Sequence, residues 1–199
     1  MKKMWKDTGI LFLITLVSGL LLGVVYDVTK EPIAYQKELK TTKAYQEVFP
    51  DATAFETLEL AMAETQGEGA ADTVTINSTS RAKDASGNLL GYVMDITSHE
   101  GYNGDIRFSM GIRMDGTING ISLLSIAETP GLGMKAEDVL KPQFAGKISG
   151  GFVLTKTGAV ISDEIDAISG ATITSTALVE GVNRGLDWFY SELGGGSNE

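Results

Sequence analysis

A long apolar run near the amino terminus constrains this chain more than any other feature. Residues 10–26 are almost wholly apolar, and a count from Gly9 gives about 18 residues without a charge. At about 1.5 Å per residue the run forms roughly 27 Å of helix, close to the minimum for crossing a bilayer core. Apolarity on every side of that helix argues against a place in a soluble core. We therefore predict a transmembrane anchor, in contact with membrane lipid, over residues 9–26.

The charges that flank this run indicate its orientation. Lysines precede it at positions 2, 3 and 6, whereas the residues that follow carry no positive excess: Asp27, Lys30 and Glu31. The positive-inside rule predicts a single pass through the cell membrane, with residues 1–8 in the cytoplasm and the rest extracytoplasmic. A cleaved signal peptide is the competing interpretation, but the apolar core is long for one and no Ala-x-Ala-like site follows.

Composition restricts the chemistry of the remainder. The chain has no cysteine, so it holds no disulfide, thiolate metal site or iron–sulfur cluster of its own. Its formal net charge is −10; residues 1–26 contribute +2, from three lysines and one aspartate, so the rest carries −12. An acidic exterior of this kind disfavours nucleic acid as a partner.

The sequence after the anchor predicts a stalk and one domain. Residues 27–60 are charged and mixed, which indicates a juxtamembrane helical stalk with Pro32 near its start; residues 51–60 are compatible with a further helix or a strand. Residues 61–193 are long enough for one domain with its own core. Within them, residues 61–72 are rich in Ala, Gly and Glu and predict a loop or a frayed helix. Residues 194–199 predict a flexible tail.

The pattern inside the domain predicts an α+β fold. From residue 73 to residue 126, apolar and polar residues alternate in several short runs, and Asp115-Gly116 is a strong hairpin signal. These runs predict an antiparallel, meander-like sheet. Residues 136–140 predict a short helix and residues 152–155 one more strand. Small or apolar residues then recur at helical spacing from Ala177 to Phe189, which predicts a long helix that flanks the sheet.

A loop rich in small and hydroxyl residues, 166–175, leads into that last helix. The start of a helix offers free backbone N–H groups and a partial positive charge, which together bind phosphate. A threonine hydroxyl at this place allows the phosphate to be bonded to the chain as well. The simpler alternative is a capped helix with Ser169 or Thr172 as N-cap and glycine serving only the turn.

The string Asp166-x-x-Ser169-Gly170-Ala171-Thr172 resembles the flavinylation motif of the FMN-binding domain family. That family includes the G subunit of the Rnf electron-transport complex and the C subunit of the sodium-pumping NADH:quinone oxidoreductase. The resemblance implies that FMN is joined through its phosphate to the hydroxyl of Thr172, as a phosphodiester. It further implies a separate flavin transferase that uses FAD as the donor. Thr174 and Thr176 are nearby hydroxyls that do not end the string.

Two further segments resemble the same family. Residues 128–133, Glu-Thr-Pro-Gly-Leu-Gly, look like its second signature, and residues 101–106 look like its Gly-Tyr-x-Gly-x-Ile segment. A Pro-Gly pair favours a sharp turn, and glycine allows the backbone to approach a flat ligand. The resemblance places the cofactor against both loops. The expected cofactor-binding residues are Asp166, Ser169, Gly170, Ala171, Thr172, Thr174, Ser175, Glu128, Thr129, Gly131, Leu132 and Gly133. For Glu128, a hydrogen bond to flavin and the capping of a turn remain open.

Other chemistry finds little support in the residues. His99 is the only histidine, which leaves a nucleophilic triad with one candidate base, and it is better explained as a hydrogen-bonding surface residue. No tight acidic cluster resembles a calcium loop, so we expect no metal site. Gly131-x-Gly133 lacks the dinucleotide fingerprint, and Gly146-Lys147 lacks the Ser or Thr of a phosphate loop. We expect no catalytic residue beyond the flavin.

The resemblance implies a membrane-anchored electron carrier with covalent FMN. It would act as a relay in an Rnf-type complex that passes electrons between ferredoxin and NAD and moves sodium ions or protons. Its partners would be the membrane and peripheral subunits of that complex. The quinone-reductase C subunit is the nearest alternative. A non-redox anchored scaffold or sensor, and a flavin-dependent reductase acting alone, are alternatives from other classes.

Overall fold

A computed structural model describes residues 2–58 and 73–194. The chain divides into two compact units, Met1–Lys40 and Thr41–Glu199. The loop or frayed helix expected over residues 61–72, and residues 195–199 of the expected tail, lie outside the described residues.

The described residues of the first unit, 2–40, are helical and belong to α1, Lys2–Val48. The stretch Trp5–Val48 contains an 18-residue window with a mean hydropathy of 2.4, so α1 is long and apolar enough to cross a membrane. Pro32 lies inside α1 and does not mark the start of a separate stalk helix. A proline in a helix interior removes one backbone hydrogen bond, which a helix of this length tolerates because the neighbouring turns stay bonded.

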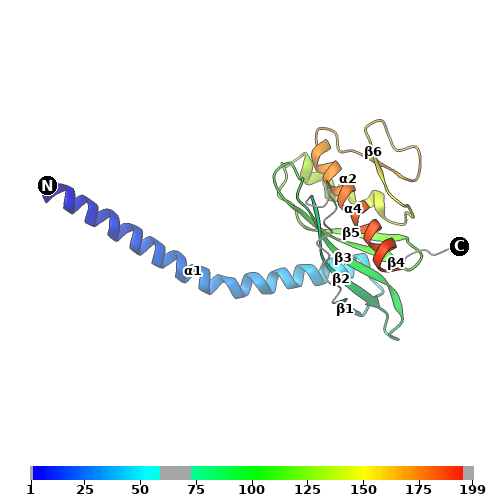
Figure 1. The fold of residues 1–199 in the computed structure, drawn as a ribbon, viewed down its shortest axis with the longest axis horizontal. Helices are drawn as coiled ribbons and strands as arrows, with labels where there is room; N and C mark the ends of the chain where they lie inside the picture. Colours follow the sequence, from blue (N-terminus) through cyan, green and yellow to red (C-terminus); the bar gives the residue numbers. More distant parts are fainter. Residues whose placement is uncertain (1, 59–72, 195–199) are drawn as a thin grey trace. The chain divides into compact units, whose positions relative to one another are not determined.

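The second unit is built on a five-stranded antiparallel sheet with the order β1-β2-β3-β4-β5 (Figure 1). Each strand pairs with its neighbour in the sequence, which confirms the predicted meander. Its strands are β1 Ala54–Leu58, β2 Val74–Lys83, β3 Leu89–Ser98, β4 Ile106–Arg113 and β5 Ile118–Ser125. The expected Asp115-Gly116 turn joins β4 to β5, with Gly116 at φ 85° and Arg113 N donating to Thr117 O at 2.8 Å.

For residues 51–60 the sequence left a helix and a strand open, and the structure has the strand. α1 ends at Val48, inside the range 27–60 expected for the helical stalk, and residues 54–58 pair along β2 as β1. Thr57 and Phe55 face Ser80 and Ala82 in the register. Their pairing gives hydrogen-bond partners to the backbone N–H and C=O groups along the outer side of β2. This stabilisation comes from a segment distant in the sequence, so local helix propensity does not indicate it.

The remaining elements surround the sheet. They are η1 Gly133–Lys135, α2 Ala136–Val139, α3 Lys141–Phe144, β6 Val153–Thr155, β7 Glu164–Asp166 and α4 Thr172–Glu192. The predicted short helix corresponds to α2 and the predicted extra strand to β6. Strand β7 was not predicted; it pairs with β6 in parallel, outside the main sheet.

Helix α4 packs on one face of the sheet through two glycines. A methyl group at Gly181 would come within 2.9 Å of the Phe108 ring, and one at Gly185 within 2.7 Å of Ile96 Cδ1. The helix therefore lies flush on β3 and β4. Its buried residues, among them Leu178 and Phe189, join the sheet in the main hydrophobic core.

The last turn of α1 packs on the opposite face, again over glycines. A methyl group at Gly111 would lie 2.9 Å from Val48 Cβ, and one at Gly91 would lie 2.8 Å from the Phe49 ring. Tyr45, Val48 and Phe49 form a second buried cluster there. The sheet is thus covered by α4 on one side and, over β3 and β4, by residues 45–49 on the other.

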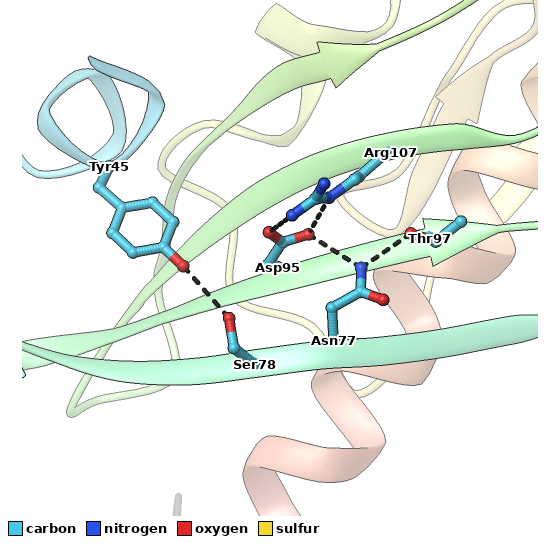
Figure 2. Close-up of polar contacts among 6 residues, drawn as sticks. All are labelled: Tyr45, Asn77, Ser78, Asp95, Thr97 and Arg107. Carbon is cyan, nitrogen blue, oxygen red and sulfur yellow. Dashed lines mark hydrogen bonds and ion pairs between the residues drawn. The ribbon is translucent and has the colours of Figure 1, made fainter. Parts of the chain in front are cut away.

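Beside that cluster, a buried carboxylate is fully paired (Figure 2). Asp95 is 1% exposed; Arg107 Nε donates to its Oδ1 at 2.8 Å and Arg107 Nη2 to its Oδ2 at 2.5 Å. Asn77 Nδ2 donates to the same Oδ1 at 3.0 Å and to Thr97 Oγ1 at 2.8 Å. A buried charge needs such partners, because without them its desolvation is uncompensated. This network stabilises β2, β3 and β4.

Candidate functional site

The loop before α4 is a tight turn that requires glycine. Ala171 N donates to Ile168 O at 3.0 Å, which closes a turn over Ser169 and Gly170. Gly170 has φ 78°, the left-handed region that a type II turn needs at its third position. The turn delivers the chain directly into the first residue of α4, Thr172.

The predicted N-cap is wrong. The N-cap position of α4 is Ala171, with no side-chain cap, and Thr172 is already helical. Ser175 holds the loop instead: its Oγ donates to Ala171 O at 2.8 Å and accepts from Ile168 N at 3.0 Å. Ser175 lies inside the helix and ties Ile168 to Ala171; it accepts from none of the first N–H groups of α4. In the described part of the chain, the helix start therefore has no side-chain acceptor on its first N–H groups, which leaves them available to an anion.

The hydroxyls of the loop and the first turn differ in access. Thr174 and Ser175 are 1% and 0% exposed, and both point into the protein. Thr172 and Thr176 are half-buried, and Ser169 is exposed. A small open pocket lies beside Thr172, lined by Glu100, Thr172, Ile173, Thr176 and Ala177. Of the expected site residues on α4, only Thr172 combines a hydroxyl with a place in this pocket.

The second expected loop has the sharp turn that its sequence predicts. Leu132 N and Met134 N donate to Thr129 O at 3.1 and 3.3 Å, and Gly131 has φ 78°. Leu132 is 42% exposed at the tip of the loop. The loop therefore exposes an apolar side chain, while its backbone is held by hydrogen bonds within the turn.

The structure brings the two loops together. A methyl group at Gly170 would lie 3.2 Å from Leu132 Cδ2. One at Gly133 would come within 2.7 Å of both Thr174 Oγ1 and Glu128 Cβ. Segments 128–133 and 166–175 thus form one surface. Each segment contributes a glycine, Gly133 or Gly170, at a place where a side chain would clash with or crowd its neighbours.

The third segment joins them through Glu128, a carboxylate that is only 5% exposed. A methyl group at Gly101 would lie 2.9 Å from Glu128 Oε1. Asn103 N donates to the same oxygen at a long 3.5 Å, and Asn103 Nδ2 donates to Ala127 O at 2.7 Å. Glu128 therefore contacts the neighbouring loop and does not cap its own turn. Within the described residues this weak bond is the one hydrogen bond that its carboxylate accepts, so the buried group retains capacity for a ligand donor.

A pair of carboxylates stands near the pocket. Burial raises the pKa of Glu180, and a hydrogen bond and like charge from Glu100 raise it further. Thr172, Thr176 and Glu180 follow one another at a spacing of four along α4, so they share a face of the helix. The face of α4 that carries Thr172 therefore also carries a carboxylate, Glu180, beside Glu100 of the pocket.

Sequence reasoning missed one residue that holds the loop before α4. Gln143 in α3 binds both backbone groups of Asp166: Asp166 N donates to Gln143 Oε1 at 2.8 Å, and Gln143 Nε2 donates to Asp166 O at 3.1 Å. Asp166 therefore contributes its backbone to the position of the loop. A single glutamine 23 positions away carries no sequence signal for this role.

His99 has hydrogen-bonding partners on the surface, with Nδ1 3.0 Å from Asp105 Oδ1 and Nε2 3.1 Å from Thr75 Oγ1. Within residues 2–58 and 73–194, no group of three or more His, Cys, Asp or Glu side chains is placed to hold a metal ion.

Comparison with known proteins gives two family matches. The model of the FMN-binding domain matches residues 101–187, and the model of the RnfG N-terminal region matches residues 1–48. The first match includes all three converging segments, 101–106, 128–133 and 166–175. The second match ends at the residue where α1 ends.

Curated relatives match over nearly the whole length. The G subunit of the Na(+)-translocating ferredoxin:NAD(+) oxidoreductase complex of Acetobacterium woodii is 34% identical over 197 residues, covering 96% of this chain and 93% of that protein. The G subunit of the ion-translocating oxidoreductase complex of Methanosarcina acetivorans is 30% identical over 198 residues, covering 97% and 98%. The crystal structure of Shewanella oneidensis NqrC aligns with a TM-score of 0.49 at 18% identity, covering 74% of this chain and 82% of that one.

Proposed function

Because this chain belongs to the family of G subunits of ion-translocating oxidoreductase complexes and carries its FMN-binding domain, we propose that it is a membrane-anchored electron carrier with FMN bonded to Thr172. The observation that carries the proposal is the place of the Thr172 hydroxyl. It stands at the first residue of α4, beside an open pocket, where no side chain caps the helix.

The residues around Thr172 fit a phosphoryl group. A phosphodiester keeps one negative charge, and the backbone N–H groups at the start of α4 can stabilise it, an effect worth about 0.3–1 kcal/mol at an exposed helix start. Thr174 and Ser175 are buried, so neither offers a hydroxyl to a transferase without opening the loop. Access therefore supports Thr172 over Thr174 as the attachment residue.

The converging loops fit the rest of the cofactor. Leu132 and Ile173 are 42% and 54% exposed next to the attachment point and offer apolar contact to a flat ring. Glu128 offers an acceptor between the loops, and the exposed backbone at Gly131 allows close approach. When bound, FMN supplies the electron-accepting and electron-donating chemistry, while the protein supplies placement and electrostatics.

A covalent bond has a clear advantage beyond the membrane, where a dissociated flavin would be diluted away. It replaces a finite binding constant by a fixed local concentration. We propose that residues 9–26 span the membrane, that residues 1–8 stay in the cytoplasm, and that the domain is extracytoplasmic. The proposal rests on the apolarity of α1 and on the lysines that precede it.

The names of the relatives describe complexes that act on ferredoxin and NAD and translocate ions. We propose that this chain has the same place, as the G subunit and flavin relay of an Rnf-type complex coupled to sodium ions or protons. It has no cysteine, so any iron–sulfur cluster of the complex belongs to a partner subunit. The same proposal assigns the ferredoxin, NAD and ion sites to partner subunits.

Co-production with a flavin transferase tests the covalent cofactor. We expect the full chain to fluoresce under ultraviolet light after boiling in detergent and denaturing electrophoresis, because a phosphodiester survives conditions that release bound FMN. The same chain produced without transferase should be dark. A dark band in the presence of active transferase would instead support the scaffold or sensor alternative.

A single introduced cysteine tests the orientation, because the chain has none of its own. Ser86→Cys lies in the exposed turn between β2 and β3, and Asp7→Cys precedes the apolar run. In spheroplasts, a membrane-impermeant maleimide should label Ser86→Cys and leave Asp7→Cys unlabelled until the membrane is opened. The reverse pattern would refute the proposed orientation.

A further inference from the structure

The short helix α3 contacts both the 166–171 turn and the end of α1, and α2 is joined to it through the Glu137–Lys141 pair. On one side, the Gln143 amide binds the N–H and the C=O of Asp166, the first residue of the attachment motif. This two-point contact fixes the backbone at the entry to the 166–171 turn. Any displacement of α3 therefore displaces the loop that leads to Thr172.

On the other side, Lys141, two residues before Gln143, pairs with the last turn of α1. Its Nζ bonds to Glu47 Oε1, and it also donates to Glu137 Oε1 in α2 at 2.5 Å. Burial acts to raise the pKa of Glu47, but the bonds from Lys141 and Ser122 outweigh it, so the pKa of Glu47 is lowered. The Lys141 side chain is 21% exposed and the Glu47 side chain 49%, so the pair is shielded from water mainly on the lysine side.

The last turn of α1 is itself held firmly on the sheet. Ser122 Oγ in β5 donates to Glu47 Oε2 at 2.5 Å, and Asn119 Nδ2 bonds to the Val48 carbonyl. Arg113 Nε orients Asn119 through its Oδ1 at 2.8 Å. Glu47 is therefore not a free surface carboxylate but the point where α1, the sheet and α3 meet.

Helix α2 also continues directly from the second loop of the site. Residues 133–135 form η1, and α2 begins at Ala136. Ala136, Leu140 and Phe144 are each 0% exposed, so α2 and α3 are packed into the core as one block. The block of α2 and α3 therefore follows segment 128–133 directly in the sequence and is hydrogen-bonded to segment 166–175 through Gln143.

We propose that α2 and α3 are a positioning bridge, in which Lys141 and Gln143 tie the flavin attachment loop to the last turn of α1 through Glu47. That this bridge holds the flavin in place rests on the proposed function. Its contacts are between protein residues and do not depend on a cofactor. Loosening the Glu47–Lys141 pair loosens segments 128–135 and 166–171 together, and with them the flavin at Thr172.

Amide hydrogen exchange on the full chain in detergent, produced without transferase, tests the bridge. We expect Lys141→Met and Glu47→Gln each to raise exchange in segments 128–135 and 166–171 about threefold or more, because each removes the Glu47–Lys141 ion pair. The double variant should exchange no faster than the faster single one, and Lys141→Arg should restore slow exchange. The matched control is Lys83→Met, which breaks the Glu56–Lys83 pair (2.6 Å) between β1 and β2 and should leave both segments unchanged.

Unchanged exchange at 166–171 in Glu47→Gln and Lys141→Met would overturn the bridge, as would additive effects in the double variant. If Lys141→Met fails to fold, Glu47→Gln decides alone, since that side chain is half exposed. On the flavinylated chain, the same variants should lower the fluorescence anisotropy of FMN. Absence of FMN would refute the proposed function while the exchange result still decides the bridge.

Discussion

Replacing Thr172 with valine should abolish covalent flavin completely. Valine has the shape of threonine without the hydroxyl, so it removes the one atom that the phosphodiester needs. Thr172 Oγ1 takes part in no cap of α4, and the position is half-buried at the helix start. We therefore expect the fold to change by no more than about 0.5 kcal/mol. In-gel fluorescence after co-production with transferase measures the loss, and urea unfolding checks the fold.

Thr176→Val is the matched control for this result. Thr176 lines the same pocket, one helical turn away, and is equally half-buried. It should keep full fluorescence. If Thr172→Val stays fluorescent and Thr176→Val turns dark, the attachment point lies one turn further along α4 and the placement at Thr172 is wrong.

Replacing Gly133 with valine should have the second largest effect, on both stability and flavin attachment. The first added carbon would come within 2.7 Å of Glu128 Cβ and Thr174 Oγ1, and neither atom is at the end of a flexible chain. The two loops must separate to admit it. Overpacking of this kind costs about 1–3 kcal/mol. We expect urea unfolding to show that loss, and the flavinylated fraction to fall severalfold because the surface beside Thr172 is broken.

Gly120→Val provides the comparison, since no heavy atom lies within 4 Å of a methyl group at that position in β5. It should change flavin attachment little. Should Gly133→Val load flavin as well as Gly120→Val does, the contact between the two loops would have no part in forming the site.

The elements that depend on local pattern could be predicted from the sequence. Alternation indicated β2 to β5 and their meander order, and the Asp115-Gly116 pair indicated the hairpin between β4 and β5. Features set at long range were left open or missed. Residues 51–60 were left open between helix and strand, and β1 forms because β2 offers an unpaired side. The missed strand β7 forms by pairing with β6, eleven residues earlier in the register. Neither partner is visible in the local sequence.

The candidate site shows the same division. The three segments were identified by resemblance, and the structure brings them together at Gly101, Gly133 and Gly170. Neither Ser169 nor Thr172 caps α4: the N-cap position is Ala171, and Ser175, a residue inside the helix, holds the preceding loop through Ile168 N. Gln143 and Lys141 were missed because each is a single polar residue without a motif. Their roles depend on a fold that places α3 between the attachment loop and the end of α1.

The intact mass of the chain purified from its native membranes tests the central claim most directly. A protein flavinylated at Thr172 should be heavier than its polypeptide by one FMN less one water, and peptide mapping should find that mass on the fragment that contains Thr172. A chain with the mass of the bare polypeptide would contradict the account of a covalently bound electron carrier.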